Sequence, residues 1–163
     1  MSEQKKTFRM RKYQPQDMHF LFENSNCFNF LDLDFLNCDI NFTEIFNSMM
    51  KIFIHDFFIF ENVDESTPIG FIYNYDFRLY DAHCCFDYYL QTEDSSGFYV
   101  KEFIDEMFHE YLLNKVFAHV SQLQEKKQYV LEKLGFHKEA ILKEYKFESG
   151  KYLDVYVYGY ERK

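Results

Sequence analysis

The amino-acid sequence predicts an α/β (α+β) fold in which helices pack on the faces of a mixed sheet. Segments with apolar residues at helical spacing alternate along the chain with short runs rich in aromatic and β-branched residues, which are typical of strands. Hydrophobic residues make up 47% of the chain, which holds only 5 Gly and 2 Pro, so its composition is that of a folded protein. Its 163 residues are enough for one domain with a buried core.

The first third of the sequence predicts one strand and two helices. Residues 7–12 are expected to form the strand, and Pro15 suits the first turn of a helix. Asn41, with Glu44 three residues later, is typical of a helix N-terminus. The apolar residues that follow at helical spacing are Phe42, Ile45, Phe46, Met49, Met50 and Phe53.

The middle of the chain predicts three consecutive strands and then the strongest helix. The strands are expected at residues 56–63, 69–75 and 83–90. After the polar segment 91–97, one apolar stripe predicts a helix, opposite a face of charged residues. The stripe consists of Val100, Phe103, Ile104, Met107, Phe108, Tyr111 and Leu112.

The last third predicts a strand, a helix and a closing hairpin. Residues 115–120 are expected to form the strand, and Ser121 with Gln124 to begin a helix that stops at Gly135. Two strands at 136–147 and 152–160 then flank a turn at 148–151. Without a repeat or a linker-like segment, we treat residues 7–161 as a single domain.

Charge and apolar runs restrict the class of protein. The formal net charge of −9 argues against binding of duplex nucleic acid or of an anionic membrane surface. No apolar run approaches the roughly 20 residues of a membrane span, and we expect a cytoplasmic protein. His83, Cys84 and Cys85 suggest a metal site with His55 or His119, but adjacent cysteines rarely bind one ion together, so we expect none.

A segment of small residues precedes the strongest predicted helix. Ser95, Ser96 and Gly97 come directly before it, where backbone N–H groups without partners favour a bound phosphate. The same residues are also typical of an ordinary helix cap. The sequence therefore leaves open whether this segment binds an anion or only starts the helix.

Three segments of the chain together match one known pattern, namely Phe8-Arg-Met-Arg-Lys12, Pro68-Ile-Gly-Phe-Ile72 and Leu131-Glu-Lys-Leu-Gly-Phe136. In these segments the chain resembles the GNAT family of acetyl-CoA-dependent N-acetyltransferases, closest to its ribosomal-protein N-terminal acetyltransferase branch, and the resemblance spans almost the whole chain. It implies a mostly antiparallel, twisted sheet with a central parallel pair that splays apart, here residues 83–90 and 115–121. The pantetheine arm of acetyl-CoA, the co-substrate, would insert between these two strands.

The resemblance also implies which residues contact acetyl-CoA. The backbone of Tyr88, Tyr89 and Leu90 would pair with the pantetheine amides, as an added strand does. The diphosphate would lie on N–H groups of residues 95–100, and Gln124 and Lys127 would contact the pantetheine arm or a phosphate. This second group of cofactor-binding residues is Ser95, Ser96, Gly97, Phe98, Tyr99, Val100, Gln124 and Lys127.

The sequence departs from the family pattern at several of these positions. Asp94 stands where the phosphate loop has a basic or amide residue, and Tyr99 where it has a second small residue. Lys127 replaces a Ser near the thiol, and Leu131 replaces the tyrosine that protonates the thiolate. A carboxylate repels a diphosphate, so these changes favour a modified cofactor site.

Asp87 and Tyr129 are the candidate catalytic residues. Asp87, a lone carboxylate in an apolar strand, is a candidate base or else a solvent-facing residue. Tyr129 is a candidate acid or else a packing residue, because it lies two positions before Leu131. We expect direct acetylation of a primary amine, either a protein N-terminus or a small amine, by a protein that forms a homodimer. The alternative is a non-catalytic protein of this fold that binds CoA or a protein partner.

The 21 Phe and 14 Tyr residues are unusually many. Most of them fall on the predicted apolar stripes and are expected in the core. The row Tyr156, Tyr158 and Tyr160 on the last strand is expected to form either an acceptor pocket wall or a face for a partner.

Overall fold

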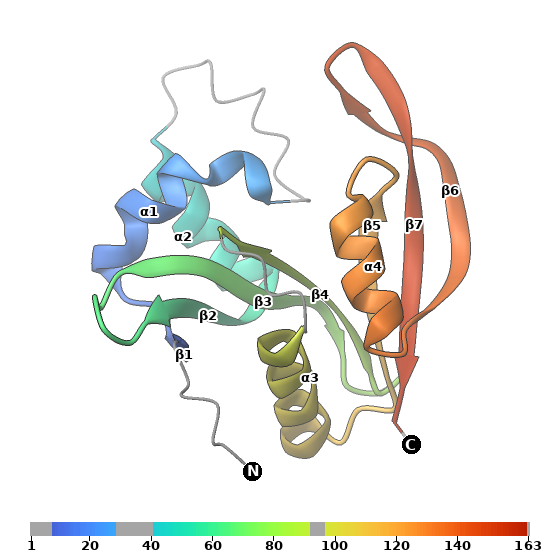
Figure 1. Cartoon of the computed structure of the whole chain (residues 1–163), viewed down its shortest axis with the longest axis horizontal. Helices are drawn as coiled ribbons and strands as arrows, with labels where there is room; N and C mark the ends of the chain where they lie inside the picture. Colours follow the sequence, from blue (N-terminus) through green and yellow to red (C-terminus); the bar gives the residue numbers. More distant parts are fainter. Residues whose placement is uncertain (1–7, 29–40, 92–96, 163) are drawn as a thin grey trace. The chain divides into compact units, whose positions relative to one another are not determined.

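The computed structural model describes residues 8–28, 41–91 and 97–162. Its strands are β1 (Phe8–Lys12), β2 (Ile54–Asn62), β3 (Pro68–Arg78), β4 (His83–Leu90), β5 (Lys115–Ser121), β6 (His137–Glu148) and β7 (Lys151–Glu161). They form one sheet in the order β1-β2-β3-β4-β5-β7-β6 (Figure 1). The pair β4–β5 is parallel, whereas β1–β2, β5–β7 and β6–β7 are antiparallel. The expected mixed sheet with a central parallel pair is confirmed.

The chain divides into two compact units. Unit 1 contains residues 1–74 and 88–93, and unit 2 contains residues 75–87 and 94–163. The chain crosses from one unit to the other within β3 and again within β4. Among the described residues, no helix is both long and apolar enough to cross a membrane.

The helices of unit 1 form where the sequence predicts them. A 3₁₀ turn, η1 (Pro15–Asp17), leads into α1 (Met18–Glu23), with Pro15 in the first position, where the absence of an N–H group costs nothing. A second turn, η2 (Ser25–Cys27), follows α1. The later helix α2 (Phe42–Ile52) is capped by the Asn41 side chain, which accepts a hydrogen bond of 3.0 Å from the Thr43 N–H.

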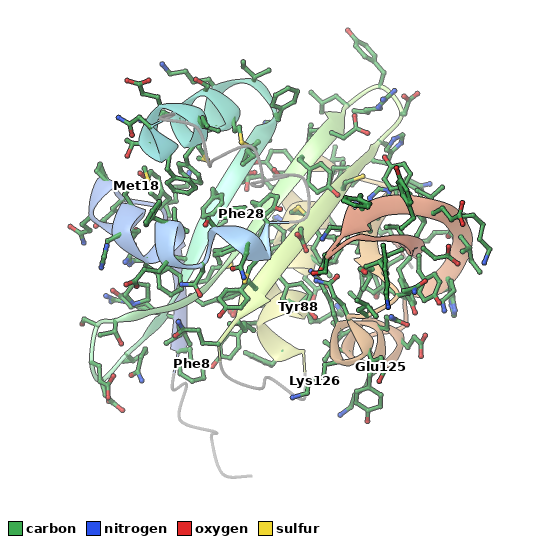
Figure 2. All side chains as sticks on the ribbon, turned by 90° about the horizontal axis from the view of Figure 1, so that it is seen from above. Phe8, Met18, Phe28, Tyr88, Glu125 and Lys126 are labelled. Atoms are coloured by element: carbon green, nitrogen blue, oxygen red, sulfur yellow. The ribbon has the colours of Figure 1, made fainter. Side chains whose placement is uncertain are left out.

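Aromatic rings fill the core of unit 1. Phe28, which is 2% exposed and is labelled in Figure 2, stacks on Phe71 with ring centroids 4.4 Å apart. The rings of Phe46, Phe57 and Tyr73 lie 5.8–6.2 Å from the ring of Phe28. The aromatic excess of the sequence is therefore largely core material in this unit, as expected.

Two buried carboxylates join the first strand of unit 1 to its neighbours. Arg11 binds Asp17 with two hydrogen bonds of 2.7 and 2.8 Å, and its Nε lies 3.1 Å from Glu61. Glu61 also accepts a 2.6 Å hydrogen bond from Arg9. Asp17 is 2% exposed and Glu61 5% exposed, so their charges depend on these arginines. The network fixes β1 against β2 and against the start of α1.

Unit 2 contains the helices α3 and α4. Helix α3 (Phe98–Tyr111) buries most of the stripe that the sequence predicts, namely Val100, Phe103, Ile104, Met107 and Phe108. Of the other two predicted residues, Tyr111 is half-buried, and Leu112 follows the end of the helix and is 73% exposed. Helix α4 (Glu125–Lys133) lies beside β5 and β7 (Figure 1). The Tyr158 hydroxyl of β7 donates a 2.8 Å hydrogen bond to Glu132 of α4.

The two ends of α4 differ in how well the sequence predicted them. At the C-terminus, Gly135 has φ 94°, and the N–H groups of Gly135 and Phe136 bond to the carbonyls of Glu132 and Leu131. This is the expected glycine cap. At the N-terminus, the helix begins only at Glu125, because the Gln124 side chain accepts a hydrogen bond of 3.1 Å from the Ser121 N–H and closes a separate turn.

The tyrosine row of β7 is not one exposed face. Tyr158 is fully buried, and Tyr156 and Tyr160 are half-buried. Tyr158 pairs with Ala118 of β5, whose small side chain leaves room for the ring on the face that α4 covers. The expectation that all three tyrosines form a partner face is therefore wrong for Tyr158.

Candidate functional site

The parallel pairing of unit 2 stops before its strands end. It runs from His83–Lys115 to Phe86–Ala118, although β5 continues to Ser121. The next residue on each strand is Asp87 on β4 and His119 on β5. Two ionisable side chains therefore follow directly on the last paired residues.

Strand alternation predicts that Asp87 and His119 share one face of the sheet. Cys84 and Phe86 contact α3 through Met107 and Phe103, so Cys85 and Asp87 belong to the other face. Cys85 pairs with Phe117, and His119 lies two residues further along β5 on the same side. Both groups thus lie on the face opposite α3, at the point where the pairing ends.

Lys127 of α4 forms a buried ion pair with Asp87. Asp87 is 1% exposed, and the Lys127 side chain is 10% exposed. The Nζ atom of Lys127 donates a hydrogen bond to Oδ1 of Asp87. Because α4 contacts Tyr158 on the helix-covered face, the ammonium reaches Asp87 from that side, where the pairing of β4 and β5 ends.

Tyr75 of β3 contacts His119 through a hydrogen bond. Its hydroxyl lies 3.2 Å from Nδ1 of His119. Phe77, two residues on, contacts Tyr111 of α3 instead, with ring centroids 4.9 Å apart. Asp76 between them has φ 46°, which breaks the alternation of the strand, so that Tyr75 faces His119 while Phe77 faces the helix.

The surroundings keep these groups electrically neutral, apart from the ion pair. Burial lowers the pKa of His119, although the charges of Asp87 and Asp76 act in the opposite direction. Burial raises the pKa of Tyr75 well above its usual range, and nearby Cys85 and Asp87 add to the shift. The pKa of Cys85 is raised to about 12, chiefly by burial. At neutral pH His119, Tyr75 and Cys85 are therefore uncharged.

The start of α3 lies outside this cluster but in the same unit. Gly97 caps the helix with φ 65°, and a Cβ atom there would lie 2.9 Å from side-chain atoms of Val130 and Leu134. Left-handed backbone and close packing against α4 thus both require a glycine. Val100 is fully buried, Tyr99 is half-buried and Phe98 is 50% exposed. Ser95 and Ser96 lie outside the described residues.

The remaining predicted residues are spread over both units. Tyr88, Tyr89 and Leu90 end β4 and are half-buried, and they belong to unit 1. Gln124 is half-buried, with its amide oxygen bonded to Ser121. Tyr129 is 61% exposed on α4. The structure thus joins Asp87 to Lys127 but places Tyr129 in solvent.

Sequence reasoning missed the pairing of Tyr75 with His119. These residues are 44 positions apart. Tyr75 lies in a run of aromatic residues and His119 in an apolar strand, and both patterns are typical of a core. The sequence suggested His119 only as a distant metal ligand. Within the described part of the chain, no three His, Cys, Asp or Glu side chains are grouped as a metal site would require. The one available signal was a histidine in an otherwise apolar strand.

The structure is similar to solved structures of a spermidine N-acetyltransferase from Vibrio cholerae. Its complex with CoA and spermine has a TM-score of 0.78 and 19% sequence identity, and the match covers 96% of each chain. A dodecameric form has a TM-score of 0.77 at 20% identity, covering 96% of this chain and 95% of that one. Mutant forms of the spermidine/spermine N-acetyltransferase SpeG from the same organism have a TM-score of 0.76 at 20% sequence identity, and the match covers 94% of each chain.

These similarities show the fold, which is the GNAT acetyltransferase fold implied by the resemblance. No protein-family model matches the sequence, and no curated protein matches it. The ribosomal-protein branch finds no support in these structures, which are of a polyamine acetyltransferase.

Proposed function

We propose that the protein is an acetyl-CoA-dependent N-acetyltransferase that acetylates a primary amine by direct attack, within one acyltransferase domain over residues 7–161. The observation that carries the proposal is the end of β4–β5 pairing at Phe86–Ala118, followed on each strand by an anchored ionisable group. The shared fold and the CoA complex of a structural neighbour support the choice of acetyl donor.

The acceptor that we propose is a small cationic amine. The structural neighbour binds spermine, and the net charge of −9 steers cations toward this protein. A protein N-terminus was the other expectation, and the structural neighbours give it no support. The acceptor class therefore follows from charge and from the polyamine-binding neighbour together.

The proposed donor site uses the predicted residues, while Tyr129 and Gln124 change their roles. Backbone groups of Tyr88, Tyr89 and Leu90 are proposed to bind the pantetheine arm, and the N–H groups at the start of α3 the diphosphate. Asp87 remains a candidate catalytic residue. Tyr129 is exposed, so we propose no direct role for it. Gln124 is half-buried and bonded to Ser121, so we propose that it positions the start of α4.

Acetyl-CoA is expected to stabilise the protein against heat. At a concentration of 100 Kd, binding adds about 2.7 kcal/mol to the free energy of unfolding. For a chain of this size that raises Tm by about 5 to 10 °C. Differential scanning fluorimetry with increasing acetyl-CoA measures the shift, and unchanged Tm at millimolar acetyl-CoA would contradict the proposal. Release of free thiol on addition of spermidine then separates transfer from binding alone.

A non-catalytic protein is the second candidate, and one observation favours it. Lys127 stands in place of a small residue, and its ammonium occupies the point where β4 and β5 stop pairing. Leu131, fully buried, stands in place of the usual acid. This candidate predicts that Lys127→Ser raises the affinity for CoA without producing transfer, whereas Lys126→Ser, at the exposed neighbour in Figure 2, leaves affinity unchanged.

We further propose that the protein assembles as a homodimer in the cytoplasm. The edge strand β6 and its partner β7 expose large apolar side chains, namely Ile141, Tyr145, Phe147 and Tyr152. Exposed apolar side chains on an edge strand are typical of an interface. Light scattering of the purified protein measures the assembly.

A further inference from the structure

Acetylation of an amine that is protonated at neutral pH needs a group that takes up a proton before the amine attacks. Two groups follow the last β4–β5 pair, Asp87 and His119. Asp87 is 1% exposed and bound by the ammonium of Lys127, so a proton placed on its carboxylate would break a buried ion pair. That cost makes Asp87 the poorer acceptor.

Protonation of His119 does not carry the cost that protonation of Asp87 does. It is half-buried and uncharged at neutral pH, and its hydrogen bond to Tyr75 survives protonation because a phenol oxygen both donates and accepts. Imidazole also has an ordinary pKa close to neutral pH, where a general base is most effective. The carboxylate of Asp87 on the same face stabilises the imidazolium once it forms.

We propose that Nε2 of His119 accepts the proton that the acceptor amine loses, and that Tyr75 is the positioning residue that holds the ring. The inference deepens the proposed function and rests on it. For Nε2 to carry the lone pair, the proton of the neutral ring is on Nδ1, which donates to the Tyr75 oxygen 3.2 Å away. Tyr75 thus holds the ring in its orientation, and its hydroxyl oxygen can accept the hydrogen bond that this tautomer donates.

The protons and bonds of the reaction balance with this assignment. The bound ammonium gives one proton to Nε2, which later releases it to solvent. The amine nitrogen then forms a bond to the thioester carbon, the C–S bond breaks, and the second amine proton goes to the departing thiolate. One amide, one thiol and one proton result from one ammonium and one thioester.

Several charged or titratable groups face the His119 and Tyr75 pair. Tyr75 and Asp76 come from β3, Cys85 and Asp87 from β4, and Tyr145 of β6 acts on Tyr75. Lys127 acts through Asp87. On β7 the partner of His119 is Val157, which does not titrate. Changes at Asp87 therefore shift the pH profile through His119, and the test includes them.

The first test is the pH dependence of kcat/KM with acetyl-CoA and spermidine. In the wild type the rate is expected to rise with pH and level off above the pKa of His119. In His119→Gln it is expected to fall about 100-fold or more at neutral pH and to rise toward the pKa of the free amine, about 10. His109→Gln, at an exposed position on α3, is the matched control and keeps the wild-type profile.

Tyr75→Phe and Asp87→Asn separate the roles. Tyr75→Phe is expected to lower kcat by about 5- to 30-fold, the factor of one lost hydrogen bond, and to keep the acid limb of the profile. If His119 is the base, the rate of Asp87→Asn still falls as the pH is lowered through the pKa of His119. If Asp87 is the base, this fall at acid pH disappears in Asp87→Asn. An unchanged rate and profile in His119→Gln, or a lost limb in Asp87→Asn alone, overturns the assignment.

A second measurement does not depend on activity or on any variant that fails to fold. Nitrogen-15 NMR of the wild-type imidazoles is expected to show His119 with its proton on Nδ1 and a titration midpoint below about 6.5. A proton on Nε2 overturns the assignment. If the wild type transfers no acetyl group at any pH, the proposed function fails and this inference with it; if it does and His119→Gln matches it, only this inference fails.

Discussion

Replacing Arg11 with Met is expected to lower the free energy of unfolding by about 3 to 5 kcal/mol, the typical cost of removing one partner of a buried ion pair. Arg11 is bound by two carboxylates that are almost fully buried, Asp17 and Glu61. Methionine would leave Asp17 without its bidentate partner, while Glu61 would keep only Arg9. Urea denaturation at pH 7 measures the change.

The pH dependence gives this prediction a sign. Burial raises the pKa of Glu61, but hydrogen bonds from Arg9 and Arg11 outweigh it, so the folded pKa lies below the unfolded value. The stability that Glu61 contributes is thus present above an unfolded pKa of about 4.3 and lost as pH falls through the folded pKa. The difference between wild type and Arg11→Met is expected to shrink below that pH.

Arg78→Met is the matched control for Arg11→Met. Arg78 pairs with Asp76, but both side chains are about half exposed, so water screens the pair. No measurable change in stability is expected from this substitution. Equal losses in the two variants would contradict the claim that burial of the carboxylates makes the Arg11 network costly to break.

Single substitutions in the Asp87–Lys127 pair are expected to cost about 3 to 5 kcal/mol each, because each leaves one buried charge without its partner. In the double variant Asp87→Asn, Lys127→Met, the free energy of unfolding is expected to fall by clearly less than the sum of the losses in the two single variants. A double-mutant cycle from urea denaturation measures this coupling. Lys126→Met, at the exposed neighbouring position, serves as the control and changes stability little.

Additive effects in this cycle would show that the two charges do not depend on one another. In that case Lys127 would not hold Asp87, and Asp87 could take up a proton without breaking an ion pair. A double variant that is as stable as the wild type would give the strongest support for the mutual dependence of the two charges. It would show that the charges serve a purpose other than stability.

Local features of the chain were predicted well because they depend on residues close in sequence. The Asn41 cap, the Gly135 cap and the apolar stripe of α3 each follow from patterns within a few positions. The start of α4 was predicted one turn early, since Ser121 and Gln124 form their own turn before the helix. Strand positions followed from aromatic and β-branched content.

The candidate site was predicted only in part. Asp87 was identified because a lone carboxylate in an apolar strand is conspicuous, and Lys127 because of its place relative to Gly135. Their contact across 40 positions, and that of Tyr75 with His119 across 44, depend on strand register and on the left-handed residue Asp76. None of these is a local property.

By itself the sequence determined the type and order of the helices and strands, because helical and strand periodicities and their caps are short-range. Only the tertiary structure decided which polar side chains meet, that Tyr158 is buried and that Tyr129 is exposed. Those outcomes depend on where the pairing of β4 and β5 ends and on which face α4 covers. A buried charge is stable only beside its partner, and the fold alone places that partner.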